Sequence, residues 1–125
     1  MARGGSNIRQ RTLICLGGTL EFLRELPLPV KRSFGYTLSA LQMHETPVGD
    51  IKKLEGFRGV YEIRKSVGDA YRLVYCLPIG DSLYVLHVFK KKSREGSKTP
   101  PEDLALIRQR YKIAQELSRA QSENG

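Results

Sequence analysis

The chain has 125 residues, a length that suits one domain built around a single hydrophobic core. Hydrophobic residues make up 40% of it and charged residues 27%, so the composition excludes an intrinsically disordered chain and a disulfide scaffold. The 21 Lys and Arg residues outnumber the 13 Asp and Glu residues, and the formal net charge of +8 favours a polyanionic partner.

The first part of the chain predicts a strand followed by a helical hairpin. Residues 11–16 form a short apolar run that ends at a Gly-Gly pair, which is typical of a strand. Thr19 can cap a short helix over residues 20–26, which ends before Pro27. A second helix over residues 29–43 has one apolar stripe at helical spacing, formed by Val30, Phe34, Leu38 and Leu41.

The middle of the chain predicts a loop and an antiparallel meander. Residues 46–59 contain one proline and three glycines, which indicates a connecting loop whose Ile51 and Leu54 point inward. Three strands are then expected over residues 60–65, 70–77 and 83–90. Short turns at residues 68–69 and 78–81 join them, so neighbouring strands run antiparallel.

The C-terminal part predicts a long helix. A polar loop over residues 91–98 precedes Thr99-Pro100-Pro101-Glu102, a capping box that places the helix start at Pro100. Its buried stripe is expected to consist of Leu104, Ile107, Tyr111, Ala114 and Leu117. The element order βααβββα indicates an α+β fold with helices packed on one antiparallel sheet.

The ends of the chain and the cysteines bear on its location. The first apolar run, LICL, is far too short for a secretory signal or a membrane span, so we expect a cytosolic protein. Cys15 and Cys76 lie in apolar runs without a Cys-x-x-Cys pair and are expected to be reduced core residues. We expect one domain over residues 1–125, with residues 1–10 and 121–125 flexible.

Positive charge is concentrated in residues 64–98. The eight basic residues of this segment are Arg64, Lys65, Arg72, Lys90, Lys91, Lys92, Arg94 and Lys98, and it has three acidic ones. Such a concentration is typical of RNA binding, because each phosphate that a cation neutralises releases counterions. The alternative is a solvated lysine loop, which is disfavoured by the position of Arg64 and Arg72 in predicted strands.

Familiar catalytic motifs are missing from the sequence. It contains no GxxxxGK[ST], GxGxxG, HExxH or GxSxG motif and no Cys/His cluster, which argues against nucleotide-driven and zinc chemistry. Paired carboxylates of the kind that a glycosidase or a metal nuclease needs are also scarce. The sequence therefore favours cation-based chemistry without a cofactor or a metal.

Strand periodicity gives two arginines a common position. Side chains alternate between the faces of a strand, so Glu62 and Arg64 share one face, and Arg72 lies on one face of the next strand. If these faces coincide, Arg64 and Arg72 come within reach of one phosphate. In the alternative, Arg64 pairs with Glu62 or Asp69, and Arg72 packs its aliphatic stem over the sheet.

Two lysines at the end of the last predicted strand, Lys90 and Lys91, could close this site from a third side. Such a cluster suits RNA cleavage without metal, in which the ribose 2′-hydroxyl attacks its own phosphate. Fixed Arg and Lys donors stabilise the charge that develops on the phosphate oxygens. A lysine crowded by other cations can also accept or donate the proton.

Three further side chains are candidates for a role. His44 lies at the end of the second predicted helix, where a cation suits the helix dipole, and we expect it to be structural. His87 is either a hydrogen-bonded core histidine or an imidazole that faces the basic site as an acid or base. Tyr111 lies on the apolar stripe of the last helix and is expected to pack.

The motifs YEIR, YRLVY, LYVLHVFKKKS and KTP, in this order and spacing, resemble the phage-derived HigB-like branch of the RelE/ParE toxin superfamily. The resemblance runs over residues 11–117. It implies a RelE-like fold, with a helical hairpin packed on a twisted antiparallel sheet. It also implies a type II toxin that cuts mRNA in the ribosomal A site and is inhibited by a HigA-like helix-turn-helix antitoxin.

The resemblance also implies roles for individual residues. Arg72 matches a phosphate-binding arginine of RelE-type toxins, and Arg64 matches a basic position on the preceding strand. Lys91, with Lys90 beside it, stands near the position of another functional basic residue. Glu62 departs from the pattern, because RelE-type toxins have a further lysine on this strand, and no tyrosine occurs between Phe89 and Tyr111 to match their catalytic tyrosine.

The sequence therefore predicts a ribosome-dependent mRNA endoribonuclease toxin. The cleavage site is expected to consist of Arg64, Arg72, Lys90 and Lys91, with His87 as an acid or base candidate. An outer RNA-binding guide, directed at ribosomal RNA, is expected to consist of Lys65, Lys92, Arg94 and Lys98. Two alternatives stay open: a ParE-like poison of DNA gyrase, which uses the same fold, and a non-catalytic RNA- or ribosome-binding phage-derived protein.

Overall fold

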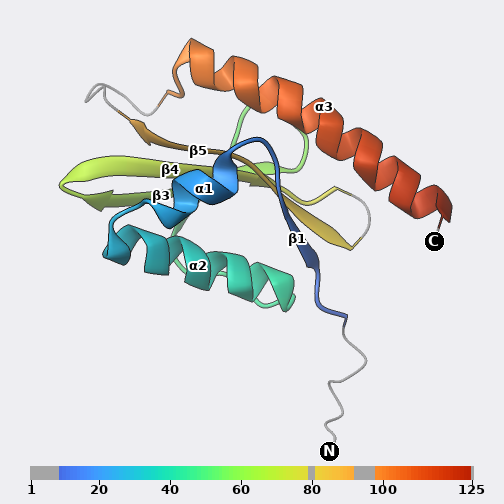
Figure 1. Ribbon diagram of the computed structural model, residues 1–125, viewed down its shortest axis with the longest axis horizontal. Coiled ribbons are helices and arrows are strands. Elements are labelled where there is room, and N and C mark those ends of the chain that lie inside the picture. The colour runs from blue at the N-terminus through green and yellow to red at the C-terminus, as the bar shows by residue number, and fades with distance from the viewer. Residues whose placement is uncertain (1–8, 79–80, 92–97, 125) are drawn as a thin grey trace, which may run out of the picture.

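The computed structural model describes residues 9–78, 81–91 and 98–124 (Figure 1). Most of the N-terminal stretch that was expected to be flexible lies outside this description. The elements in chain order are β1 (Thr12–Cys15), α1 (Thr19–Arg24), α2 (Leu28–Gln42), β2 (Asp50–Lys53), β3 (Val60–Val67), β4 (Asp69–Cys76), β5 (Ser82–Lys91) and α3 (Pro101–Asn124). All the predicted elements are present, and β2 is an additional strand.

The position of β2 corrects the prediction of a loop over residues 46–59. This strand pairs antiparallel with β3, and its Ile51 stands opposite Ile63. Its four residues, DIKK, include one apolar side chain, so the local pattern is too weak to indicate a strand. The hydrogen bonds that hold it come from β3, the next strand along the chain, and the short DIKK segment gives no local sign of that pairing.

The five strands form one sheet in the order β1-β5-β4-β3-β2. The meander prediction is confirmed, because β3, β4 and β5 are antiparallel neighbours. The prediction of a purely antiparallel sheet is wrong at one edge, since β1 pairs with β5 in parallel and Thr12 stands opposite Ser82. A parallel pair needs a long crossover, and the chain from α1 to β4 supplies it.

Helices cover both faces of the sheet (Figure 1). On the face of α1 and α2, Phe34 and Leu38 pack in one apolar cluster with strand residues such as Leu73. On the face of α3, Ile107 packs in a second cluster with Val74. The predicted stripe of α2 is confirmed by the burial of Val30, Phe34, Leu38 and Leu41.

All three helices begin one residue away from the predicted start, α2 at Leu28. α1 begins at Thr19 itself, with Gly18 at the N-cap and no side-chain cap hydrogen bond, so the prediction that Thr19 caps this helix is wrong. α3 begins at Pro101, and the hydroxyl of Thr99 donates a hydrogen bond to Glu62. The helix-capping motif thus contributes Thr99 to a contact with the sheet.

The buried stripe of α3 differs from the prediction at its last position. Ile107 and Ala114 are buried, but Leu117 is 44% exposed and Ser118 is 6% exposed. With 3.6 residues per turn, the buried line passes from Ala114 to Ser118 and turns Leu117 outward. The helix continues through Asn124. No helix in the described part of the chain is both long and apolar enough to cross a membrane.

Both cysteines are free thiols, as predicted. Cys76 is buried on β4, and burial raises the pKa of its thiol to about 12. Cys15 is partly buried on β1, and burial is also the main cause that raises its pKa. Because the thiolate is the reactive form, both cysteines are suited to packing rather than to nucleophilic chemistry.

A bulge in β5 decides which of its side chains face α3. Val74 of β4 stands opposite His87, whereas the next residue, Tyr75, stands opposite Val85, so Leu86 is the additional residue. Leu86 packs in the α3-side cluster, and His87 forms a hydrogen bond with a residue of α3. The alternation of side chains is therefore shifted by one residue from the bulge to the end of the strand.

Candidate functional site

Two arginines stand directly opposite each other in the sheet. The register of β3 and β4 pairs Arg64 with Arg72 and Glu62 with Val74. Val74 belongs to the apolar cluster on the α3 side, so all four side chains share that face. This confirms the prediction that the arginines of the two strands lie on one face.

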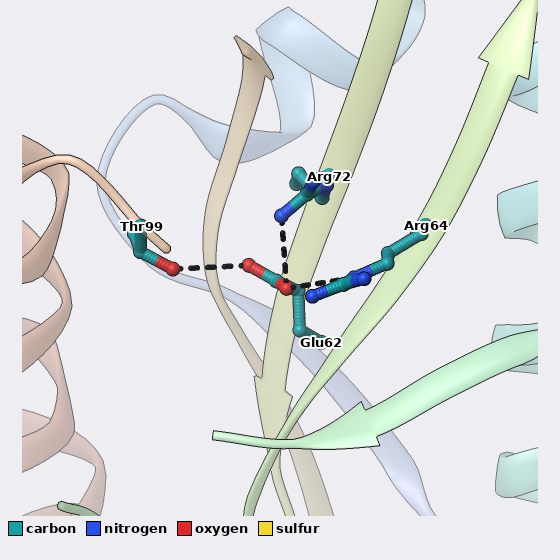
Figure 2. Close-up of polar contacts among 4 residues, drawn as sticks. All are labelled: Glu62, Arg64, Arg72 and Thr99. Carbon is teal, nitrogen blue, oxygen red and sulfur yellow. Dashed lines mark hydrogen bonds and ion pairs between the residues drawn. The ribbon is translucent and has the colours of Figure 1, made fainter. Parts of the chain in front are cut away.

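The Glu62 carboxylate lies between these arginines (Figure 2). Its Oε1 atom accepts a hydrogen bond from Arg64 Nε at 3.2 Å and another from Arg72 Nη1 at 3.1 Å. Its Oε2 atom accepts a bond from the Thr99 hydroxyl at 3.2 Å. Glu62 is 2% exposed and Arg72 is 7% exposed, so these charge-assisted bonds are shielded from water.

The ion pairs confirm part of the alternative to a phosphate site, in which Arg64 pairs with Glu62. The bond to Glu62 engages one nitrogen of each guanidinium, and a guanidinium carries five N–H donors. Glu62 therefore fixes the orientation of both arginines without using the whole of either group. A fixed donor is the kind that stabilises developing negative charge most effectively.

Of the two lysines predicted to close the site, Lys91 is the one that lies on the face of Arg64 and Arg72. It is the last residue of β5 and stands opposite Ala70, on the same face as Arg72, and it is 5% exposed. Burial lowers the pKa of the Lys91 ammonium, and the positive charges of Arg72 and Arg64 lower it further. Glu62 opposes this effect. A lysine in this position is suited to proton transfer.

We expect the Lys91→Met variant to be more stable than the unmodified chain at neutral pH. At neutral pH the folded protein holds the Lys91 charge in a less favourable environment than water, and methionine removes that cost. Folding lowers the pKa of Lys91, so the unmodified protein gains free energy of unfolding as the pH rises towards 10.5, the ordinary pKa of a lysine. The difference in melting temperature between the variant and the unmodified protein therefore shrinks. Melting curves between neutral and alkaline pH measure this effect. A Lys91→Met variant that melts at or below the temperature of the unmodified chain at neutral pH would contradict the expectation.

Lys90 does not close the site, so that prediction is wrong. It stands opposite Tyr71, which belongs to the apolar cluster on the α2 side, and its ammonium pairs with Asp69 at 3.4 Å. The bulge in β5 is the reason, because it shifts the alternation by one residue. Lys65, predicted to guide RNA, also stands opposite Tyr71 and thus lies on the α2 side.

His87 is a hydrogen-bonded core residue, one of the two alternatives that the sequence left open. Its Nε2 atom lies 2.6 Å from Asp103 Oδ1, and its Nδ1 atom lies 3.1 Å from Arg110 Nη1. Because a guanidinium only donates, Nδ1 accepts, and Nε2–H donates to Asp103. Arg110 also donates to the carbonyl of Leu86. These contacts join β5 to α3 and occupy both ring nitrogens.

The other two candidate side chains have structural contacts, as predicted. His44 follows the end of α2 with a φ of +60°, and its Nε2 atom lies 2.7 Å from the carbonyl oxygen of Arg9. The Tyr111 hydroxyl donates to the carbonyl of Arg58, and its ring contacts Phe57 edge to face. Tyr111 thereby holds the loop between β2 and β3 against α3.

The residues Glu62, Arg64, Arg72 and Thr99 form what we call the Glu62 cluster. A cavity of about 480 Å³ opens beside this cluster, between β2, β3 and the start of α3. Its basic lining residues are Lys52, Lys53, Arg64 and Lys98. Lys98 was predicted to guide RNA, whereas Lys92 and Arg94 lie outside the described residues. Lys52 and Lys53 were missed because their segment was predicted to be a loop. The two adjacent lysines of the sequence DIKK were the signal that could have indicated a basic site here.

These observations define a small α+β protein whose sheet carries an arginine pair with one buried member, a buried lysine and a basic cavity. The chain matches the family described as Phage derived protein Gp49-like (DUF891) over residues 21–112, which is more than half of its length. It therefore belongs to the Gp49-like family of phage-derived proteins, a family related to RelE/HigB-type toxins. Comparison with curated proteins and with solved structures gave no match.

Proposed function

We propose that the protein is the toxin of a type II toxin–antitoxin system and that it cleaves mRNA on the ribosome. The observation that carries the proposal is the pair of arginines, Arg64 and Arg72, which stand opposite each other and are both oriented by Glu62 beside a basic cavity. Membership of a family related to RelE/HigB-type toxins supports the toxin part. A HigA-like helix-turn-helix antitoxin is the proposed inhibitor.

In the proposed reaction, the 2′-hydroxyl oxygen attacks the adjacent phosphorus as its proton leaves, and the bond from phosphorus to the 5′ oxygen breaks. The 5′ oxygen takes up a proton, which leaves a 2′,3′-cyclic phosphate and a 5′-hydroxyl end. Arg64 and Arg72 donate hydrogen bonds to the phosphate oxygens, where negative charge develops. Neutral Lys91 is proposed to accept the proton of the 2′-hydroxyl and, as the ammonium, to donate it to the 5′ oxygen, since its lowered pKa enlarges its neutral fraction.

Primer extension on mRNA after induction, with and without ribosomes, tests this function. We expect new 5′ ends within translated sequences, and these ends appear only when ribosomes are present. Translation is expected to stop before any DNA damage is visible. DNA damage that comes first would overturn the proposal in favour of a gyrase poison. Salt-sensitive RNA binding without any cleaved product would overturn it in favour of a non-catalytic RNA-binding protein.

A further inference from the structure

The cavity beside the Glu62 cluster has the size of a site for one nucleotide. Its volume of about 480 Å³ lies in the lower part of the range found for small-molecule pockets, ~300–1,000 Å³. Lys52, on β2, stands opposite Glu62 and thus on the face that carries the arginine pair. A single nucleotide, rather than a longer stretch of RNA, therefore fits the space that the cavity offers next to this pair.

The walls of the cavity divide into basic and apolar parts. The basic part consists of Lys52, Arg64 and Lys98, which suit a phosphate, whereas Lys53 stands opposite Tyr61 and thus lies on the α2 side. Leu54, which follows β2, and Leu104, in the first turn of α3, form the apolar part. Phosphate and base are the two chemically different parts of a nucleotide, and apolar side chains can contact the flat face of a base.

Glu55 is an unexpected lining residue for a site that binds a polyanion. A carboxylate repels phosphate, so it favours RNA binding where it accepts a hydrogen bond, and the exocyclic amino groups of bases are suitable donors. Both oxygens of the other lining carboxylate, Glu62, already accept bonds from protein donors. In contrast, no hydrogen bond or ion pair joins the Glu55 side chain to another residue in the part of the chain that the structure describes.

We infer that this cavity binds one nucleotide next to the cleaved phosphate and that Glu55 selects its base. This inference rests on the proposed function. Carboxylates accept hydrogen bonds from exocyclic amino groups, which adenine, cytosine and guanine have and uracil lacks. Single-stranded RNA exposes these groups on the base edges. Glu55 is therefore a specificity-determining residue that disfavours uracil at one position beside the cut.

Mapping of cleaved mRNA ends in induced cells tests the inference. We expect uracil to be depleted about tenfold at one fixed position beside the cut, and the Glu55→Gln variant to lose this depletion while it still cleaves. The matched control is Glu116→Gln, which makes the same change on the exposed surface of α3 and keeps the depletion. Cleavage by the unmodified chain without any base preference at a fixed position would overturn the inference and leave the proposed function intact.

A binding measurement covers the case in which no mRNA is cleaved and the proposed function fails. Its probes are short 2′-O-methyl oligomers of adenine, cytosine or uracil, which cannot undergo attack by the 2′-hydroxyl. We expect the purified full chain to bind the uracil oligomer about tenfold more weakly than the others, and Glu55→Gln to remove the difference. Lys52→Ala is expected to weaken the binding of all three oligomers equally. Equal affinities for the three in the unmodified chain would overturn the inference.

Discussion

Cells that express the Arg72→Ala variant should keep growing, whereas cells that express the unmodified chain should arrest. Arg72 is the buried member of the arginine pair, and Glu62 fixes its guanidinium on the face that carries the basic site. Removal of one fixed donor to a developing negative charge reduces the rate by about 100- to 1,000-fold in comparable sites. The measurement is growth after induction, followed by cleavage of mRNA with purified protein and ribosomes.

Two further variants make the Arg72 result interpretable. Lys90→Ala removes a basic residue of β5 on the opposite face, where it pairs with Asp69, and growth arrest should persist. Arg72→Lys keeps a positive charge but lacks the planar donor fork, so cleavage should still fall by a large factor. Melting curves establish that each variant is folded. Growth arrest by folded Arg72→Ala protein would overturn the assignment of the site.

Among single substitutions of charged residues in the site, Glu62→Ala should lower the free energy of unfolding the most. Glu62 is buried and accepts bonds from Arg64, Arg72 and Thr99, so its loss leaves two neighbouring cations without their shared carboxylate. Removal of one partner from a buried ion pair costs about 3 kcal/mol of unfolding free energy. For a domain of this size we expect the melting temperature to fall by roughly 10 °C.

A surface ion pair provides the matched control for Glu62. Asp69 pairs with Lys90 at 3.4 Å, and both side chains are largely exposed, so Asp69→Ala should cost less than about 1 kcal/mol. Inorganic phosphate should raise the melting temperature of Glu62→Ala more than that of the unmodified chain, because a bound anion replaces the lost negative charge. Equal stability losses in Glu62→Ala and Asp69→Ala would contradict the central place of this carboxylate.

The arginine pair could be predicted from the sequence because its position depends on local rules. Period-two alternation gives Arg64 and Arg72 their faces, and the tight turn at Gly68, with a φ of +74°, sets the register between their strands. Glu62 was visible on the same face as Arg64, but its second oxygen accepts a bond from Thr99, 37 positions further along the chain. That contact requires the three-dimensional packing of α3.

Other features depend on contacts that a local pattern does not contain. β2 exists because β3 completes its hydrogen bonds, and β1 is parallel because it meets β5 after a long crossover. The prediction for Lys90 failed at the bulge, where Leu86 is an additional residue within a continuous apolar run. The sequence around Leu86 shows nothing that would indicate where the alternation of side chains between the two faces shifts by one residue.

The bulge at Leu86 also bears on how related chains can vary in length. The residues before it are paired with both β1 and β4 and the residues after it with β4, so a chain without Leu86 would still place the same lysine opposite Ala70. If Leu86 were instead taken into a regular ladder, Lys90 would stand there in place of Lys91. Deletion of Leu86 would therefore leave the lysine of the site in place, and in such a chain the matching lysine is found by its distance from the strand end.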